Sequence, residues 1–142
     1  MPDILDFSNV KITEEVDFSK AKKVDSICKI NIYGTDISKI KLRYEMFKLY
    51  FPKKDNIPFE LQANVYEQLL NNFKKNGYIR SYEKLDKEYK ELYYIEKGGM
   101  YKIVNLFQKY WWGYGYDKLS ILLYTIGFFV FFWSNYSVSK IE

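Results

Sequence analysis

Histidine is absent from this chain of 142 residues, and cysteine occurs once, at Cys28. Without histidine the chain lacks the imidazole that Ser–His–Asp triads and most zinc sites use. A single cysteine cannot form an internal disulfide, so we interpret Cys28 as a small buried apolar residue rather than a reactive thiol. The glycine-rich patterns of phosphate and dinucleotide loops are also missing from the sequence. These absences predict a protein that is not an enzyme, with no catalytic residues, no cofactor and no metal site.

Arginine is scarce as well, and the positive charge comes almost entirely from lysine. Only Arg43 and Arg80 occur among the 22 basic residues. Residues 1–38 hold five basic and seven acidic groups, a net charge of −2, whereas residues 39–118 hold sixteen basic and ten acidic groups, a net charge of +6. Recognition of bases and phosphates usually depends on clustered arginines or a basic recognition helix, and the sequence shows neither. We therefore do not expect a nucleic acid partner.

Charged residues are missing altogether between Leu119 and Val138. These twenty residues, at a helical rise of about 1.5 Å each, cover about 30 Å, the thickness of a bilayer hydrocarbon core. The segment predicts one transmembrane helix, with a buried helix of a soluble protein as the alternative. The expected membrane-spanning residues include Leu119, Leu122, Leu123, Ile126, Phe129 and Val130.

Aromatic residues flank this apolar segment on both sides, and lysines precede it. Tryptophan and tyrosine favour the boundary between lipid and water, because their rings are apolar and carry a polar tip. By the positive-inside rule, the lysines predict a cytoplasmic N-terminal region and a location in the inner (cytoplasmic) membrane. The expected membrane-interface residues are Lys102, Lys109, Trp111, Trp112, Tyr114, Tyr116, Lys118, Trp133 and Tyr136.

A short repeat occupies the N-terminal part of the chain. The sequence LDFS at residues 5–8 returns as VDFS at residues 16–19, and apolar residues then recur every five positions at Ile27, Ile32, Ile37 and Leu42. This period fits neither a helix nor a flat strand, and it is typical of a chain that turns a corner every five residues and stacks its coils. Residues 5–42 resemble the pentapeptide-repeat family, which implies a short β-solenoid edge over residues 1–42. A small β-meander is the alternative.

The chain between the repeat and the apolar segment is largely helical in pattern. Residues 43–60 are interpreted as a linker, and amphipathic helices over 61–76 and 81–97 predict a cytoplasmic hairpin within residues 61–99. Gly98-Gly99 precedes a third amphipathic helix, whose aromatic and basic faces suit either the membrane interface or packing on the hairpin. Residues 100–116 would then form a juxtamembrane helix and turn, and residues 117–142 a transmembrane helix with a short tail.

The order of these elements resembles the C-terminal part of bacterial pentapeptide-repeat membrane proteins. In that family the repeat is often joined to a two-helix potassium-channel-like pore module. Gly113-Tyr114-Gly115 is similar to a selectivity filter in sequence only, because it precedes the single apolar segment and no Thr-Val leads into it. We interpret it as a turn, so no filter residue follows from the resemblance.

Together these patterns predict an α+β membrane protein with one C-terminal transmembrane helix. The expected function is that of a non-enzymatic single-span membrane protein whose cytoplasmic region serves protein interaction or assembly. Its expected partners are the lipid bilayer and either another protein or further copies of the chain. The alternative function is a subunit, or the truncated front part, of a pentapeptide-repeat ion channel. A membrane-bound enzyme ranks third, because the sequence shows no catalytic constellation.

Overall fold

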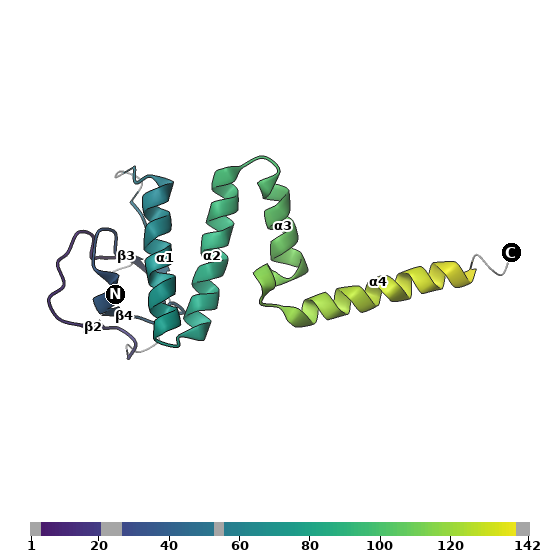
Figure 1. The fold of residues 1–142 in the computed structure, drawn as a ribbon, viewed down its shortest axis with the longest axis horizontal. Helices are drawn as coiled ribbons and strands as arrows, with labels where there is room; N and C mark the ends of the chain where they lie inside the picture. Colours follow the sequence, from purple (N-terminus) through teal and green to yellow (C-terminus); the bar gives the residue numbers. More distant parts are fainter. Residues whose placement is uncertain (1–3, 21–26, 53–55, 139–142) are drawn as a thin grey trace. The chain divides into compact units, whose positions relative to one another are not determined.

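A computed structural model describes residues 4–20, 27–52 and 56–138 of the chain (Figure 1). The chain divides into two compact units, Met1–Tyr89 and Lys90–Glu142. The division falls within a single helix, α2 (Ile79–Lys97). Each unit has its own set of contacts and is described separately.

The first unit begins with short parallel strands. β1 (Ile4–Asp6), β3 (Cys28–Asn31) and β5 (Phe47–Leu49) form one sheet in the order β1-β3-β5, and β2 (Val16–Asp17) pairs with β4 (Ile40–Lys41) in a second sheet. A turn of 3-10 helix, η1 (Ile37–Lys39), precedes β4. The fold is therefore α/β, with two small parallel sheets followed by helices.

The predicted β-solenoid over residues 1–42 is wrong. Stacked coils of one family repeat would advance the chain by a constant number of residues. Here β1 pairs Ile4 with Lys29, an advance of 25 residues, whereas β3 pairs Cys28 with Phe47, an advance of 19. The five-residue period still marks buried positions, because Ile32, Ile37 and Leu42 are almost fully enclosed, although Ile27 is 57% exposed. The five-residue period thus marks positions whose side chains are buried, but it does not produce regularly stacked coils.

Helices α1 (Phe59–Lys75) and α2 agree with the helices predicted over 61–76 and 81–97. The predicted stop at Asn76-Gly77 is confirmed. Gly77 has a φ of 72°, the left-handed conformation that glycine adopts without strain. The Tyr78 N–H donates back to the Phe73 carbonyl at 2.9 Å, which satisfies a carbonyl at the end of α1.

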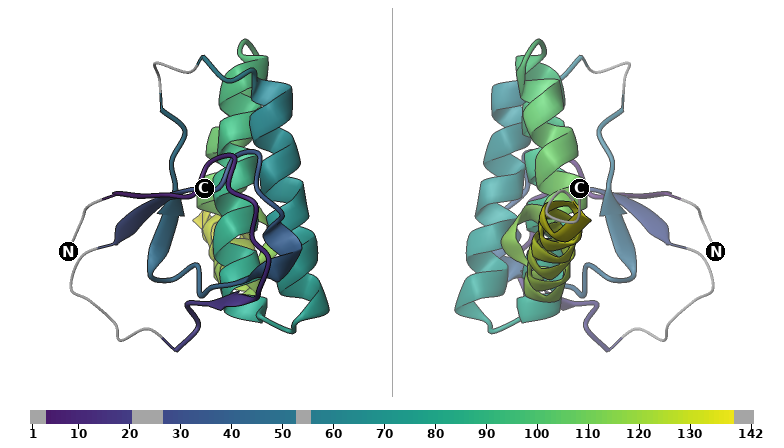
Figure 2. Two further views of the ribbon diagram at one scale, coloured as in Figure 1. Left: turned by 90° about the vertical axis from the view of Figure 1, so that its left-hand side faces the viewer. Right: turned by 90° about the vertical axis from the view of Figure 1, so that its right-hand side faces the viewer.

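The core of the first unit lies where α1 meets the strand region. Figure 2 shows α1 beside the first part of α2, with the strands next to them. The Asn72 side chain on α1 donates to the Ile37 carbonyl in η1 at 3.0 Å, which fixes the helix against this turn. The predicted linker, residues 43–60, contributes β5 and buried side chains to this core. The buried residues of α1 and of the strand region are Ile30, Ile32, Ile37, Ile40, Leu42, Tyr44, Phe47, Leu49, Val65, Tyr66, Leu69, Leu70 and Phe73.

One carboxylate joins three parts of this core. Glu88 on α2 accepts the Tyr44 hydroxyl at Oε2 and the Tyr66 hydroxyl at Oε1, both at 2.9 Å. The Tyr44 oxygen also accepts the backbone N–H of Leu49 in β5 at 3.0 Å. Burial, and then the negative charge of Glu88, raise the pKa of both tyrosines above the ordinary value for a phenol. We call Tyr44, Tyr66 and Glu88 the tyrosine–glutamate cluster.

The second unit contains the end of α2, then α3 (Tyr101–Trp111), a 3-10 turn η3 (Gly113–Gly115) and α4 (Lys118–Val138). Within residues 4–20, 27–52 and 56–138, no helix combines the length and the apolar character that crossing a bilayer requires. In α4 the uncharged, largely apolar part from Leu119 to Trp133 covers about 21 Å, short of a hydrocarbon core of about 30 Å. Ser134 and Asn135 follow it in the sequence.

The prediction of an α+β protein with one transmembrane helix is therefore wrong. Its two functional readings, a single-span membrane protein and a pentapeptide-repeat channel subunit, both need a spanning helix and are overturned by the same finding. The last part of the predicted tail, residues 139–142, lies outside the described residues.

We expect Glu88→Ala to destabilise the first unit strongly, because it leaves two largely buried hydroxyls without their acceptor. Each such loss costs about 1–3 kcal/mol, so the free energy of unfolding in a urea titration should fall by about 2–6 kcal/mol. Adding Tyr66→Phe to Glu88→Ala should restore part of the loss, because one unpaired hydroxyl is then removed. Glu83→Ala, a carboxylate removed elsewhere on α2, should change stability by no more than about 0.5 kcal/mol. Equal stability of the Glu88→Ala and Glu83→Ala proteins would contradict the assigned role of the cluster.

The raised tyrosine pKa values also predict a loss of stability in alkali. An unfolded tyrosine titrates near pH 10, and the folded pKa lies above that value, so the folded chain holds the proton more tightly. The stabilisation is complete below about pH 10 and is lost as the pH rises beyond it. Urea titrations between about pH 8 and 11 should show a steeper loss in the native chain than in Tyr66→Phe, whose residue 66 cannot ionise. Parallel pH profiles would argue against a raised pKa at Tyr66.

Candidate functional site

Helix α3 is attached to the end of α2 by polar and aromatic contacts within the second unit. The Tyr94 and Tyr101 rings are stacked with centroids 6.4 Å apart, and the Lys109 ammonium lies 2.7 Å from a Glu91 carboxylate oxygen. The contacting face of α3 is therefore one that carries Tyr101 and Lys109. The apolar stripe of α3 was expected either at a membrane interface or packed on the hairpin. Within this unit, the stripe does not pack on the end of α2.

The turn between α3 and α4 is built around Tyr114, as the interpretation of Gly113-Tyr114-Gly115 as a turn predicted. All three residues have positive φ, and Tyr114, at 60°, is a residue type that rarely adopts this conformation. The Tyr114 ring is buried and its hydroxyl donates to the Asn105 side chain of α3. Burial raises the pKa of Tyr114 above the ordinary phenol value, which is consistent with a neutral donor at this position. These contacts hold the strained residue in place and define where α4 begins.

An aromatic stack connects α3 with α4. The Phe107 and Trp111 rings are 5.3 Å apart between centroids, and Trp111 is stacked on Tyr124 of α4 at 5.4 Å. Farther along α4, Phe128 and Phe132 lie one turn apart with centroids at 4.5 Å. Aromatic pairs at these separations add roughly 0.5–1.5 kcal/mol beyond the area they bury.

Apart from this stack, the apolar side chains of α3 and α4 lie mainly at the surface. We define the apolar surface as thirteen of the large apolar residues of the two helices that are between 50 and 76% exposed. On α4 they occupy every side of the helix, since six consecutive residues, 128–133, belong to the set. The apolar surface consists of Ile103, Phe107, Tyr110, Leu119, Leu122, Leu123, Ile126, Phe128, Phe129, Val130, Phe131, Phe132 and Trp133.

The residues predicted to span the membrane all belong to this apolar surface. The residues predicted for the membrane interface divide into two groups. Lys109, Tyr114, Trp112 and Tyr116 take part in contacts inside the unit: Trp112 donates to Gln108, and Tyr116 has the Lys90 ammonium 5.5 Å from its ring centre. The side chains of Lys102, Lys118, Trp133 and Tyr136 are exposed, and Trp111 is 37% exposed and stacked.

Two aspartates of the first unit stabilise local turns. Asp36 accepts the Ser38 backbone N–H at 3.1 Å and starts η1, and hydrogen bonds from Ser38 lower the pKa of Asp36. In Asp17, hydrogen bonds from Ser19 lower the pKa in the same way. Among residues 4–20, 27–52 and 56–138, no three His, Cys, Asp or Glu side chains are placed to hold a metal ion. The sequence did not single out Glu88 or Tyr44, because no local pattern signals contacts across 44 positions.

Comparison with protein-family models, with curated proteins and with solved structures finds no match for this chain.

We expect Tyr114→Phe to loosen the second unit by about 1 kcal/mol, because the Asn105 oxygen loses its hydroxyl donor. All three tryptophans lie in this unit, so their fluorescence during urea unfolding reports on it specifically. Tyr110→Phe removes an exposed hydroxyl and should change stability by no more than about 0.5 kcal/mol. Asn105→Ala combined with Tyr114→Phe should cost little more than either change alone, since both remove one bond. Fully additive losses would show that the two side chains act separately.

Proposed function

We propose that this chain is a non-catalytic assembly protein whose apolar surface joins it to further copies of itself. The observation that carries the proposal is the exposure of large apolar side chains around the whole of α4. Trp133 is 76% exposed, Leu119 71% and Phe129 68%. Large exposed apolar surfaces on a protein are typical sites of interaction with a partner.

The pattern of α4 differs from that of an ordinary surface helix. Such a helix has one apolar stripe toward a core and a polar face toward water. Helix α1 follows this pattern, with Val65, Leu69 and Phe73 buried and Lys74 and Lys75 exposed. Helix α4 has no polar face between Leu119 and Trp133, so contact with one neighbouring helix cannot cover it. Several neighbours are needed, as in the centre of a helical bundle.

A second copy of the chain suits this surface for an electrostatic reason. Identical helices bring identical charges together, and like charges at a contact oppose association. No charged residue lies between Leu119 and Trp133, so copies of α4 can pack along their length without repulsion. Lys118 stands at the edge of this segment, where it can stay in water. Symmetric association of identical chains is also the commonest kind of oligomer.

A non-catalytic role agrees with how the described polar groups are used. Glu88 accepts two tyrosine hydroxyls, Glu91 pairs with Lys109, and Asp36 starts η1. Catalytic acids and bases need access to a substrate as well as a shifted pKa. The strongly shifted groups, Tyr44 and Tyr66, are instead enclosed in the core, where they hold strand and helix to α2.

The test is the mass of the purified full-length chain in solution without detergent. Sedimentation velocity over a hundredfold concentration range should show oligomers. The tryptophan fluorescence should shift to the blue, chiefly because the exposed Trp133 ring leaves water. The double substitution Phe129→Glu and Phe132→Glu should shift the protein to monomer, because burying these charges without partners is costly. Lys118→Glu places the same charge at the start of α4, outside the apolar segment, and should leave the oligomer unchanged.

Two results would contradict self-assembly. One is a monomer at every concentration, with a fluorescence spectrum that does not change. The other is capture of single chains by phosphatidylcholine vesicles, with loss of capture in the double glutamate variant, which would assign the same side chains to lipid.

A further inference from the structure

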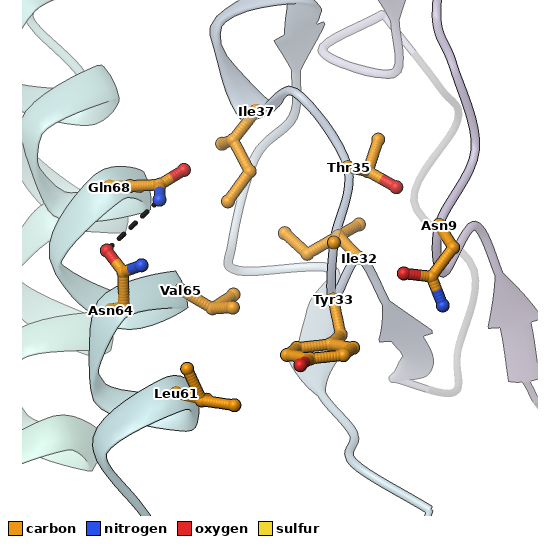
Figure 3. A pocket seen from close by; sticks show the side chains of 10 residues that line it. Asn9, Ile32, Tyr33, Thr35, Ile37, Leu61, Asn64, Val65 and Gln68 are labelled. Atoms are coloured by element: carbon orange, nitrogen blue, oxygen red, sulfur yellow. Dashed lines mark hydrogen bonds between the residues drawn. The ribbon is translucent and has the colours of Figure 1, made fainter. Parts of the chain in front are cut away.

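A hollow of about 290 Å³ lies between α1 and the turn that follows β3 (Figure 3). One wall comes from α1, with Leu61, Asn64 and Gln68, and the other comes from Asn9 and the turn at Tyr33 and Gly34. Ile32 and Val65 are buried beneath it, and Leu61, which is 42% exposed, supplies its exposed apolar side chain. All of these residues belong to the first unit, so the hollow is independent of the apolar surface on α4.

A second hollow of about 450 Å³ continues along the same face of α1. The two hollows share Ile37 and Gln68 in their linings, and we call them together the amide groove. The groove follows α1 from Leu61 to Asn76, about 22 Å at the helical rise of about 1.5 Å. That length matches about six or seven residues of an extended polypeptide at about 3.3 Å each.

Side-chain amides recur along the helical wall at Asn64, Gln68, Asn72 and Asn76. Residues four apart lie on one face of a helix and rise by about 6 Å. An extended peptide presents a peptide group to the same side every second residue, about 6.6 Å apart. The step from Asn64 to Gln68 is therefore close to the step between peptide groups in an extended chain. Farther along α1, Asn72 donates to the Ile37 carbonyl and Asn76 donates to Asn72, so these two amide nitrogens are already used within the fold.

A hydrogen bond between two of these amides fixes what they offer to the groove. The Gln68 Nε2 donates to the Asn64 Oδ1 at 3.1 Å. Figure 3 shows the Asn64 nitrogen and the Gln68 oxygen on the side of the helix that faces the turn. The groove wall thus carries one donor and one acceptor side by side, the pair that a peptide C=O and N–H require.

The opposite wall also carries an amide, and a glycine makes room for it. Gly34 has a φ of 70°, and a Cβ at this position would lie 2.1 Å from the Asn9 Oδ1. The Asn9 side chain can lie over residue 34 only because that residue has no side chain. Figure 3 shows Asn9 on the far side of the hollow from Asn64 and Gln68, so amides border it on both sides.

We propose that the amide groove binds an extended, uncharged polypeptide segment of a partner protein, with one aliphatic side chain packed against Leu61. The charges around the second hollow balance, with Glu15 and Asp36 against Lys41 and Lys75, and Glu15 pairs with Lys41 at 2.7 Å. The groove therefore favours neither sign of charge. The donor of Asn64 and the acceptor of Gln68 suit a peptide backbone, whereas the exposed Leu61 side chain suits an aliphatic residue.

The test uses the full-length chain and a positional-scanning library of fluorescent octapeptides with blocked ends, read by fluorescence polarisation. We expect a preference for an aliphatic residue at one position and for uncharged residues beside it. Binding of the selected peptide should weaken about tenfold in Asn64→Ala and in Gln68→Ala, the effect of losing about one hydrogen bond. Asn64→Asp keeps the acceptor and removes the donor, so it should weaken binding to a similar extent.

Two controls separate this groove from other surfaces. Lys74→Ala changes an exposed residue of α1 outside the groove and should leave the affinity within about twofold. The double variant Phe129→Glu and Phe132→Glu should also keep the affinity per chain, whatever its oligomeric state. Circular dichroism should show native helix content in both alanine variants, because alanine is the best helix former at these exposed positions.

Three results would overturn the proposal. The first is a library without any positional preference. The second is equal affinity of the selected peptide for the native chain and for Asn64→Ala and Gln68→Ala. The third is binding of oligosaccharides from a glycan array that depends on the same two amides, which would assign the groove to carbohydrate.

Discussion

The carboxylate of Glu88 is the group on which the first unit depends most. It accepts the hydroxyl of Tyr44, which lies just before β5, and the hydroxyl of Tyr66, which lies on α1. The Tyr44 oxygen in turn binds the backbone of β5. A strand, a helix and a second helix are therefore connected through one side chain. Short strands of two to four residues expose much of their backbone, and such sheets need a covering helix for stability. The tyrosine–glutamate cluster fixes the position of α1, and the amide groove lies along this helix.

The sequence predicted the helices well because their signals are local. The apolar spacing of Val65, Leu69 and Phe73 follows from the pitch of the helix, and Asn76-Gly77 ends α1 through the conformation of one glycine. The parallel pairing of β1 with β3 was not predictable in the same way. It joins Ile4 to Lys29 across a long connection, and no short pattern specifies such a register. The repeated LDFS and VDFS segments suggested a constant coil, but the connections between the strands differ in length.

The predicted membrane helix shows that a count of apolar residues does not by itself identify a transmembrane segment. A helix that is apolar on all sides is equally consistent with a bilayer and with the centre of a protein assembly. The composition of the helix does not distinguish a bilayer from a protein assembly. Its length does so in part, because the segment before Ser134 covers about 21 Å, less than the hydrocarbon core of a bilayer. Three residues predicted for the membrane interface, Lys109, Tyr114 and Tyr116, make contacts inside the unit. These contacts connect α2, α3 and the turn that precedes α4. The amides of the groove were not singled out from the sequence either, although Asn64, Gln68, Asn72 and Asn76 stand four apart and could have been noticed.

The two proposed surfaces work through different physical interactions, and this difference makes them complementary. Hydrogen bonds in the amide groove are directional, so they select a backbone geometry but contribute only modest affinity each. Burial of Phe129, Trp133 and their neighbours is not directional, and it contributes in proportion to area. An oligomer formed through α4 would carry one groove per copy. A partner with several extended segments would then bind the second groove at a raised effective concentration, and weak single contacts would add up to a tight complex. Assembly through one unit would in this way supply the affinity that the groove of the other unit lacks.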